Sequence, residues 1–247
     1  MALVGHGNSV ALMPSSAPTI KLSYCTAVNL MVATLRASEH ARESAPDYLK
    51  LMHTWFTLTH ATFTLEAVAN SLLAQVNLPP DEWAKKERLQ LPDKLDFLVH
   101  TKHGTHIDRQ DITYRKMNEM ISLRNYHVHP KVKDKRFTLS SSPQTRSHVV
   151  TLVDDITQYL RIPFNHMGWK PEHANVFAKL MIEVMNKLFI SDLRMTPREC
   201  EQSLCTTFSS DSGVQFLTPA DLDLVQVKFE QEHGYQFHFL RPAGQKN

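Results

Sequence analysis

Residues 124–129, with the sequence RNYHVH, place two imidazoles, one guanidinium and one amide within six positions. Histidine has an ordinary pKa of about 6.5, so it can accept or donate a proton at neutral pH, whereas arginine stays charged. Cleavage of an RNA phosphodiester without a metal needs a base for the 2′-hydroxyl, an acid for the leaving 5′-oxygen and positive charge at the phosphorus. The segment therefore has the residue types for this chemistry, which requires no cofactor.

This segment stands at the end of a predicted amphipathic helix. Apolar residues before it recur with the helical period, so we expect Arg124 on or beside the packing face. His129 precedes Pro130, and a residue before proline avoids helical backbone angles, so the helix should end there with His129 exposed. A cation at a packing face needs a partner or a function. Glu66 is the predicted supporting residue that orients or neutralises Arg124, with a solvated or internally paired side chain as the alternative.

The pattern Arg124-Asn125-x-x-x-His129 at a helix end resembles the R-x4-6-H motif of the HEPN superfamily, the higher eukaryotes and prokaryotes nucleotide-binding domains. The resemblance implies a metal-independent endoribonuclease whose Arg/His site forms across a homodimer, acting as a toxin or phage-defence effector. The implied partners are RNA, a second copy of the chain, and an antitoxin or other regulatory protein. The first alternative is a non-catalytic HEPN-like bundle that binds nucleotide, RNA or a partner protein. The second is an unrelated helical interaction protein in which Arg124 forms a buried structural ion pair.

The motif residues receive separate roles under this hypothesis. His129 is the general base or acid, Arg124 is the transition-state clamp, and Asn125 binds phosphate or orients His129. His127 lies on nearly the same helical face as Arg124 and assists or replaces His129, with an interface or core histidine as the alternative. Five residues of a regular helix advance about 7.5 Å and rotate about 140°, so Arg124 and His129 of one chain do not converge. A two-fold dimer would bring two copies of each together.

Two further patterns limit the resemblance. Arg161 and His166 have the same R-x4-H spacing, but Pro163 between them breaks a helix, so we interpret this second match as chance. HEPN toxins that are paired with a minimal nucleotidyltransferase carry R-x4-H-x-Y, and this chain has Lys131 at the tyrosine position. Control by AMPylation at that position is therefore not expected.

A basic run follows the motif directly. Its members are predicted to bind substrate along the RNA backbone, with affinity that falls as salt rises, or else to be a solvated charged run. They are Lys131, Lys133, Lys135 and Arg136.

Three histidines before the motif have the spacing of metal ligands: His100, His103 and His106. No cysteine lies nearby, and Gly104 indicates that the run crosses from a helix end into a loop. We therefore predict no metal site and interpret the run as a solvated loop that faces RNA.

Composition indicates one main domain without a membrane anchor. The 247 residues are 42% hydrophobic, which suffices for one good core, and the net charge of +2 requires any nucleic-acid contact to be a local patch. The most apolar segment, residues 22–35, is too short to span a bilayer. Cys25, Cys200 and Cys205 are odd in number and have no metal spacing, which favours a reducing cytoplasm.

The predicted fold class is mainly α: an antiparallel, HEPN-like helical bundle with a small β-hairpin insert and a small mixed C-terminal extension. Residues 1–18 are expected to form a flexible arm, 19–193 the bundle with its insert at about 135–152, and 194–247 the extension. Apolar periodicity, prolines and caps predict helices over residues 19–42, 47–75, 81–89, 91–103, 109–129 and 171–193, a short helix at 154–159 and another from 196. The segments 214–217 and 235–240 are strand-like.

Overall fold

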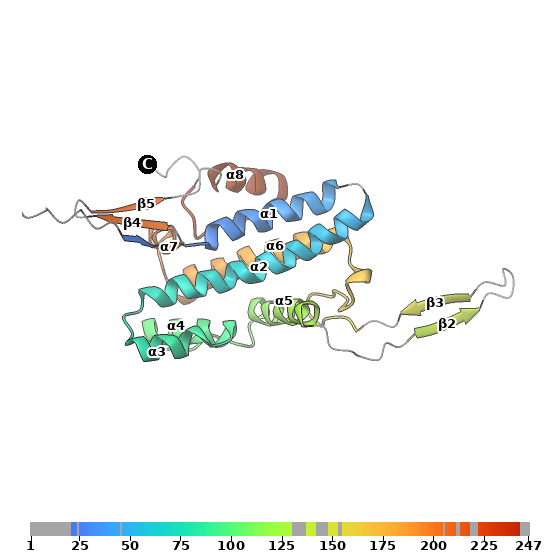
Figure 1. Ribbon diagram of the computed structural model, residues 1–247, viewed down its shortest axis with the longest axis horizontal. Helices are drawn as coiled ribbons and strands as arrows, with labels where there is room; N and C mark the ends of the chain where they lie inside the picture. The colour runs from blue at the N-terminus through green and yellow to red at the C-terminus, as the bar shows by residue number, and fades with distance from the viewer. Residues whose placement is uncertain are drawn as a thin grey trace, which may run out of the picture.

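The computed structural model describes residues 21–23, 25–44, 46–129, 137–141, 148–152, 155–204, 206–210, 213–217 and 222–242. The chain is mainly helical, as predicted, and its helices form an elongated bundle (Figure 1). No helix in these ranges has both the length and the apolarity to cross a bilayer.

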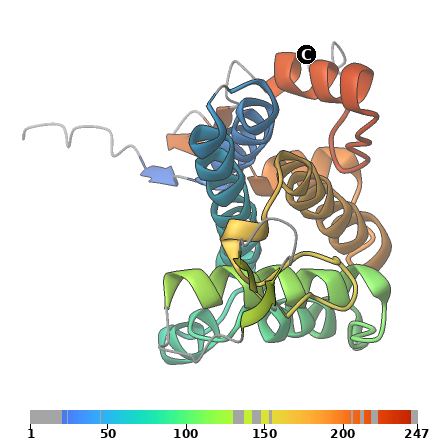
Figure 2. The ribbon, with the colours of Figure 1, turned by 90° about the vertical axis from the view of Figure 1, so that its right-hand side faces the viewer.

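The centre of the bundle is α2 (Asp47–Gln75), which has the predicted bounds and packs against α1 (Ala27–Glu43) and α6 (Pro171–Asn186). Leu58, Leu65 and other apolar residues of α2 are buried in this core. Threonine hydroxyls buried in α2 donate to carbonyls one turn earlier, so these polar groups do not oppose burial. Figure 2 shows α1 in blue beside α2, which runs from blue to teal, with α6 in orange and residues 80–128 in teal to green on other sides of α2.

The side of α2 away from α1 is covered by α3 (Pro80–Glu87), α4 (Leu91–His103) and α5 (Ile112–Val128). Gly104 ends α4 with a φ of 69°, the left-handed conformation that favours glycine at a helix end. Asp111 begins α5 because its side chain accepts a hydrogen bond from the amide of Thr113. These caps set the turn that aims α5 across α2.

The predicted helix over 171–193 is interrupted by a change of helical type. After α6 the chain continues as a π-helical segment, η2 (Lys187–Asp192), in which Leu188 and Phe189 are buried. Such segments are rare, and their hydrogen bonds join residues five apart instead of four, so each turn is wider than in an α-helix. The widened turn carries Lys187 and Asp192 together toward the beginning of α5.

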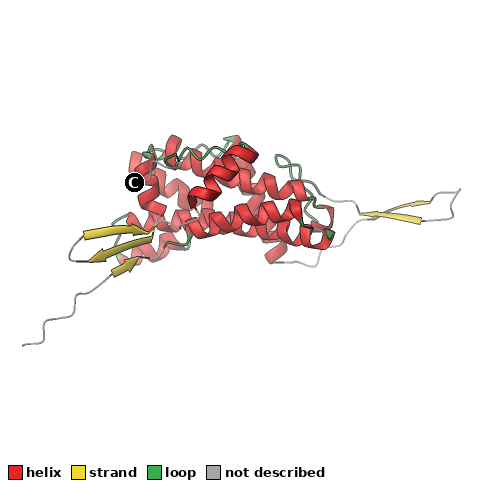
Figure 3. Cartoon of the chain, turned by 90° about the horizontal axis from the view of Figure 1, so that it is seen from above, coloured by secondary structure: helices red, strands yellow, loops and turns green. Residues whose placement is uncertain are grey.

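Two strand groups accompany the helices, at opposite ends of the view in Figure 3. β1 (Lys21–Ser23), β4 (Thr206–Ser210) and β5 (Gly213–Leu217) form an antiparallel sheet in the order β1-β4-β5. β2 (Phe137–Ser141) pairs with β3 (His148–Leu152) in antiparallel register.

Several predicted boundaries are corrected by the structure. The first helix begins at Ala27 rather than residue 19, because residues 21–23 pair with β4. Residues 155–160 form a bridge and a turn instead of a short helix.

Of the two strand-like segments predicted in the C-terminal part of the chain, 214–217 lies in β5, and 235–240 is not a strand. After the helices α7 (Pro197–Leu204) and α8 (Leu222–His233), residues 235–237 are irregular and residues 238–240 form a turn and a bend. Phe237 and Phe239 pack into the core there, so their alternation reflects burial without strand pairing.

Candidate functional site

Arg124 lies near the end of α5, and its side chain is partly buried. Its Nη1 donates a hydrogen bond of 2.8 Å to Oδ1 of the exposed Asn125, and its guanidinium lies 4.9 Å from the ring centroid of Phe63 on α2. Within the described ranges Arg124 has no carboxylate partner, and its buried Nε has no hydrogen-bond partner. The aromatic face and the amide hold this cation without neutralising it.

Glu66 does not support Arg124, which corrects the predicted role. Its carboxylate lies 4.0 Å from the ammonium of Lys94 on α4, and that ammonium donates a hydrogen bond of 2.6 Å to Asn70. Lys94 is only 2% exposed, so it loses more hydration than the half-buried Arg124 and needs the polar partners more. Glu66 is therefore part of a structural contact between α2 and α4.

His129 is exposed and stands where the helix stops. Its φ of −119° and ψ of 67° leave the helical region, as expected for a residue that precedes proline. The backbone amide of His129 still donates to the carbonyl of Asn125, which ties the residue to the last turn of α5. The imidazole is thus presented to solvent from a fixed backbone position close to Arg124 in sequence.

His127 is turned toward a neighbouring loop and packs there. Its ring meets the rings of Trp169 and His166 edge-on, with centroids 4.7 and 5.2 Å away, and hydrogen-bonds to the carbonyl of Phe164. Burial and the nearby His166 lower the pKa of His127 to about 4, against the opposing effect of the hydrogen bond. The ring is therefore neutral at pH 7, and its contacts support the alternative of a packed histidine.

The 155–169 loop, which contacts His127, is bound to α5 along its length. The carboxylate of Glu119 accepts hydrogen bonds from the amides of Tyr159 and Leu160, at 2.9 and 2.8 Å. Arg115 donates to the hydroxyl of Tyr159, and Nε1 of Trp169 donates to the carbonyl of Pro163. These contacts give the loop one position against the helix.

His166 is the residue of this region that the sequence interpretation missed. It begins the 3-10 turn η1 (His166–Gly168), is exposed, and touches His127 near the end of α5. Arg161 and His166 do not share a helix, as Pro163 indicated, and Arg161 has a φ of 59°. The signal in the sequence was the repeated R-x4-H spacing, but only the folded loop shows that His166 lies beside the motif.

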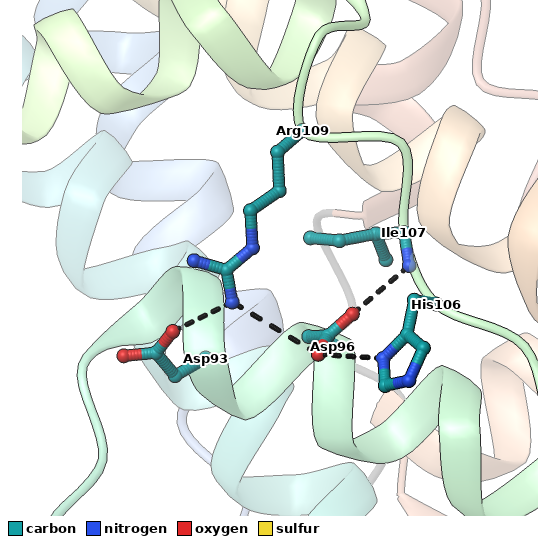
Figure 4. Close-up of polar contacts among 5 residues, drawn as sticks. All are labelled: Asp93, Asp96, His106, Ile107 and Arg109. Atoms are coloured by element: carbon teal, nitrogen blue, oxygen red, sulfur yellow. Dashed lines mark hydrogen bonds and ion pairs between the residues drawn. The ribbon is translucent and has the colours of Figure 1, made fainter.

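The three histidines before the motif have structural partners, and Figure 4 shows the contact of His106 with Asp96. The His106 ring bonds to Asp96 at 3.0 Å and stacks on His100, while Nε2 of His103 lies 3.1 Å from the carbonyl of Leu193. These contacts hold the three histidines in place at the end of α4 and in the loop before α5. In the part of the chain that is described, no three His, Cys, Asp or Glu side chains are grouped to hold a metal ion.

Asp96 is the centre of the contacts in Figure 4. One carboxylate oxygen accepts from the amide of Ile107, and the other faces His106 and, at 3.9 Å, Arg109. Burial raises the pKa of Asp96, but the hydrogen bonds from His106 and Ile107 and the nearby positive charges outweigh it and keep the pKa below its ordinary value. The carboxylate therefore stays ionised and holds the turn before α5.

The remaining predicted site residues cannot be placed. Lys131, Lys133, Lys135 and Arg136 lie outside the described residues. A cavity of about 590 Å³ runs along α6 and η2, but Arg124, Asn125 and His129 do not line it. Of the motif residues, Asn125 and His129 are exposed at the end of α5, and Arg124 is partly buried beside them.

Comparison of the chain with protein-family models, curated proteins and solved structures found no match. The case for a function therefore depends on the residues and geometry of this chain.

Proposed function

We propose that this protein is a metal-independent endoribonuclease of the HEPN type, with a composite Arg/His site across a homodimer. The observation that carries the proposal is the partly buried guanidinium of Arg124, which has no carboxylate partner among the described residues and lies on the last turns of the helix that ends at the exposed His129. A cation held by an aromatic ring and an amide remains available for an anionic ligand.

Each step of the proposed reaction is assigned to a side chain. His129 takes the proton from a 2′-hydroxyl, and the 2′-oxygen attacks the phosphorus. Arg124 stabilises the extra negative charge of the pentacoordinate phosphorus, and Asn125 keeps its guanidinium oriented through Nη1. A second imidazole protonates the leaving 5′-oxygen. The products carry a 2′,3′-cyclic phosphate and a 5′-hydroxyl.

The residues around Arg124 support the proposed dimer. Phe63 and Val128 are each 39% exposed, although both are apolar, and Phe63 lies directly under the guanidinium. A two-fold contact through such a patch buries apolar surface and brings two copies of the motif together. This arrangement supplies a second His129, and so a second imidazole, to the same site.

A non-catalytic role in binding nucleotide, RNA or a protein partner is the second candidate. It is favoured by the packing of His127, which leaves His129 as the exposed imidazole of the motif itself. One such group per chain can bind phosphate but cannot act as both base and acid unless another imidazole joins it.

The test is cleavage of total cellular RNA by the purified full chain in the presence of EDTA. We expect products with 2′,3′-cyclic phosphate and 5′-hydroxyl ends, and loss of cleavage in His129→Ala with an unchanged circular dichroism spectrum. Light scattering should give the mass of a dimer. Products with 3′-hydroxyl ends, or binding without cleavage, would overturn the nuclease. If the protein is a toxin or defence effector, its expression in cells should arrest growth, and His129→Ala should not.

A further inference from the structure

We propose that His166 is the general acid of the reaction, the second imidazole that protonates the leaving 5′-oxygen. This inference depends on the proposed ribonuclease function and adds to it a residue outside the motif. It starts from one contact: the exposed ring of His166 lies edge-on against His127, with 5.2 Å between centroids, at the end of α5 that presents His129.

His166 is placed by groups whose own positions are set. The buried Asn165 side chain accepts from the amide of Met167, and the amide of Trp169 bonds to the carbonyl of His166, which together form the turn η1. The indole of Trp169 packs under His127. The loop itself is bound to α5 through Glu119. These contacts fix the backbone at His166, so its imidazole meets a substrate from a defined position.

His127 connects the two exposed histidines. His129 follows His127 by two residues, so their Cα atoms are within about 7 Å, and the ring of His127 contacts the ring of His166. Both exposed imidazoles therefore come from residues near the end of α5, and in the proposed reaction the scissile phosphate lies between them. The packed His127 is a spacer and takes no proton itself, because it is buried against Trp169 and burial disfavours the charged imidazole.

The chemistry balances with these two groups. Neutral His129 removes the 2′-hydroxyl proton as the bond from the 2′-oxygen to phosphorus forms. Protonated His166 gives its proton to the 5′-oxygen as the bond from phosphorus to that oxygen breaks. The enzyme ends with His129 protonated and His166 neutral, and exchange of protons with water restores the starting state.

The decisive experiment compares two leaving groups. One synthetic oligonucleotide has a single ribonucleotide linkage with the ordinary 5′-oxygen, and its twin has sulfur at that bridging position. A thiolate leaves without being protonated, so removal of a general acid harms only the oxygen substrate. We expect His166→Ala to slow cleavage of the oxygen substrate by about 100-fold or more and to cleave the sulfur substrate at nearly the wild-type rate. His129→Ala should be slow on both substrates.

Met167→Ala is the matched control, because it changes a 73% exposed neighbour in the same turn and keeps the imidazole. It should cleave both substrates at the wild-type rate. Equal losses on both substrates in His166→Ala would mean a structural role and overturn the proposal. A wild-type rate for His166→Ala on the oxygen substrate would assign the acid to the second copy of His129. If wild type cleaves neither substrate and no cellular RNA, the proposed function itself fails.

Discussion

The two ends of α5 hold their charges in opposite ways. At its beginning, the ammonium of Lys187 lies 3.2 Å from Asp111 and 3.7 Å from Asp192. The hydroxyl of the buried Tyr114 donates a hydrogen bond to Asp192. At its other end, Arg124 contacts an amide and an aromatic ring and has no carboxylate partner in the described ranges.

The difference separates a cation that is paired within the fold from one that the proposed function uses for binding. Burial opposes the charge of Lys187, but Asp111 and Asp192 raise its pKa, so the cation stays in place as part of the packing. Among the described residues Arg124 has no such counter-charge, so under the proposed function an anion from solvent is attracted to it. The planar guanidinium fork matches the geometry of two anions, carboxylate and phosphate.

The largest expected effect is that of replacing Arg124, and the matched comparison is Arg109, an arginine that has a carboxylate partner. Arg124→Ala should lower RNA cleavage by about 100-fold or more, because it removes a donor that acts on the developing phosphorane charge. Arg109→Ala removes an exposed arginine that lies 2.7 Å from Asp93. It should leave cleavage unchanged and lower the unfolding free energy by less than about 1 kcal/mol. Cleavage rates and urea denaturation of both variants give the answer.

Arg124→Lys serves as the conservative control for the same position. Lysine keeps the charge but loses the planar fork and the stacking on Phe63, so we expect partial activity. If Arg124→Ala unfolds the protein while Arg109→Ala does not, the comparison is reversed and Arg124 is a structural cation.

The sequence predicted the bundle and the end of α5 because both depend on local rules. Apolar residues around most of the 47–75 segment and Pro79 after it predicted α2 with the bounds that the structure has. Pro130 predicted that the helix stops at His129, which places Arg124 on the last turns of α5 and leaves His129 exposed. Each of these inferences needs only neighbours within a few residues.

The features that the sequence did not predict depend on contacts between distant segments. Glu66 pairs with Lys94 because α4 buries that lysine against α2, and a lysine in an isolated sequence is normally solvated. His166 reaches the motif because Glu119 binds the amides of residues 159 and 160, forty positions along the chain. No spacing rule encodes either contact, since each is set by how the helices pack.

A middle-sized effect tests the paired end of α5. Tyr114→Phe removes a hydroxyl that donates to the charged Asp192 and is buried beneath Lys187. The unfolding free energy should fall by about 1.5–3 kcal/mol, as for other hydrogen bonds to charged groups, and RNA cleavage should persist. The control is Tyr48→Phe on α2, where the ring is 68% exposed and little change is expected. A loss of cleavage without a loss of stability would indicate that the active site lies at the beginning of α5 instead of its end.

The smallest effect tests whether His127 belongs to the fold or to the chemistry. Its pKa is about 4 in the folded protein and about 6.5 when unfolded, so between these values only the unfolded chain takes up the proton. The contribution of the neutral ring is therefore complete above pH 6.5 and is lost as the pH falls toward 4.

We expect the difference in unfolding free energy between wild type and His127→Gln to shrink by about 1 kcal/mol as the pH falls from 7 to 4. This value includes a reduction for solvent screening, because the ring is only half-buried. Urea denaturation at each pH measures this difference. Burial also lowers the pKa values of His53, His173 and His233, but these residues are present in both proteins and cancel. Parallel stability curves would show that His127 is solvated, and it would then become an acid–base candidate equal to His129.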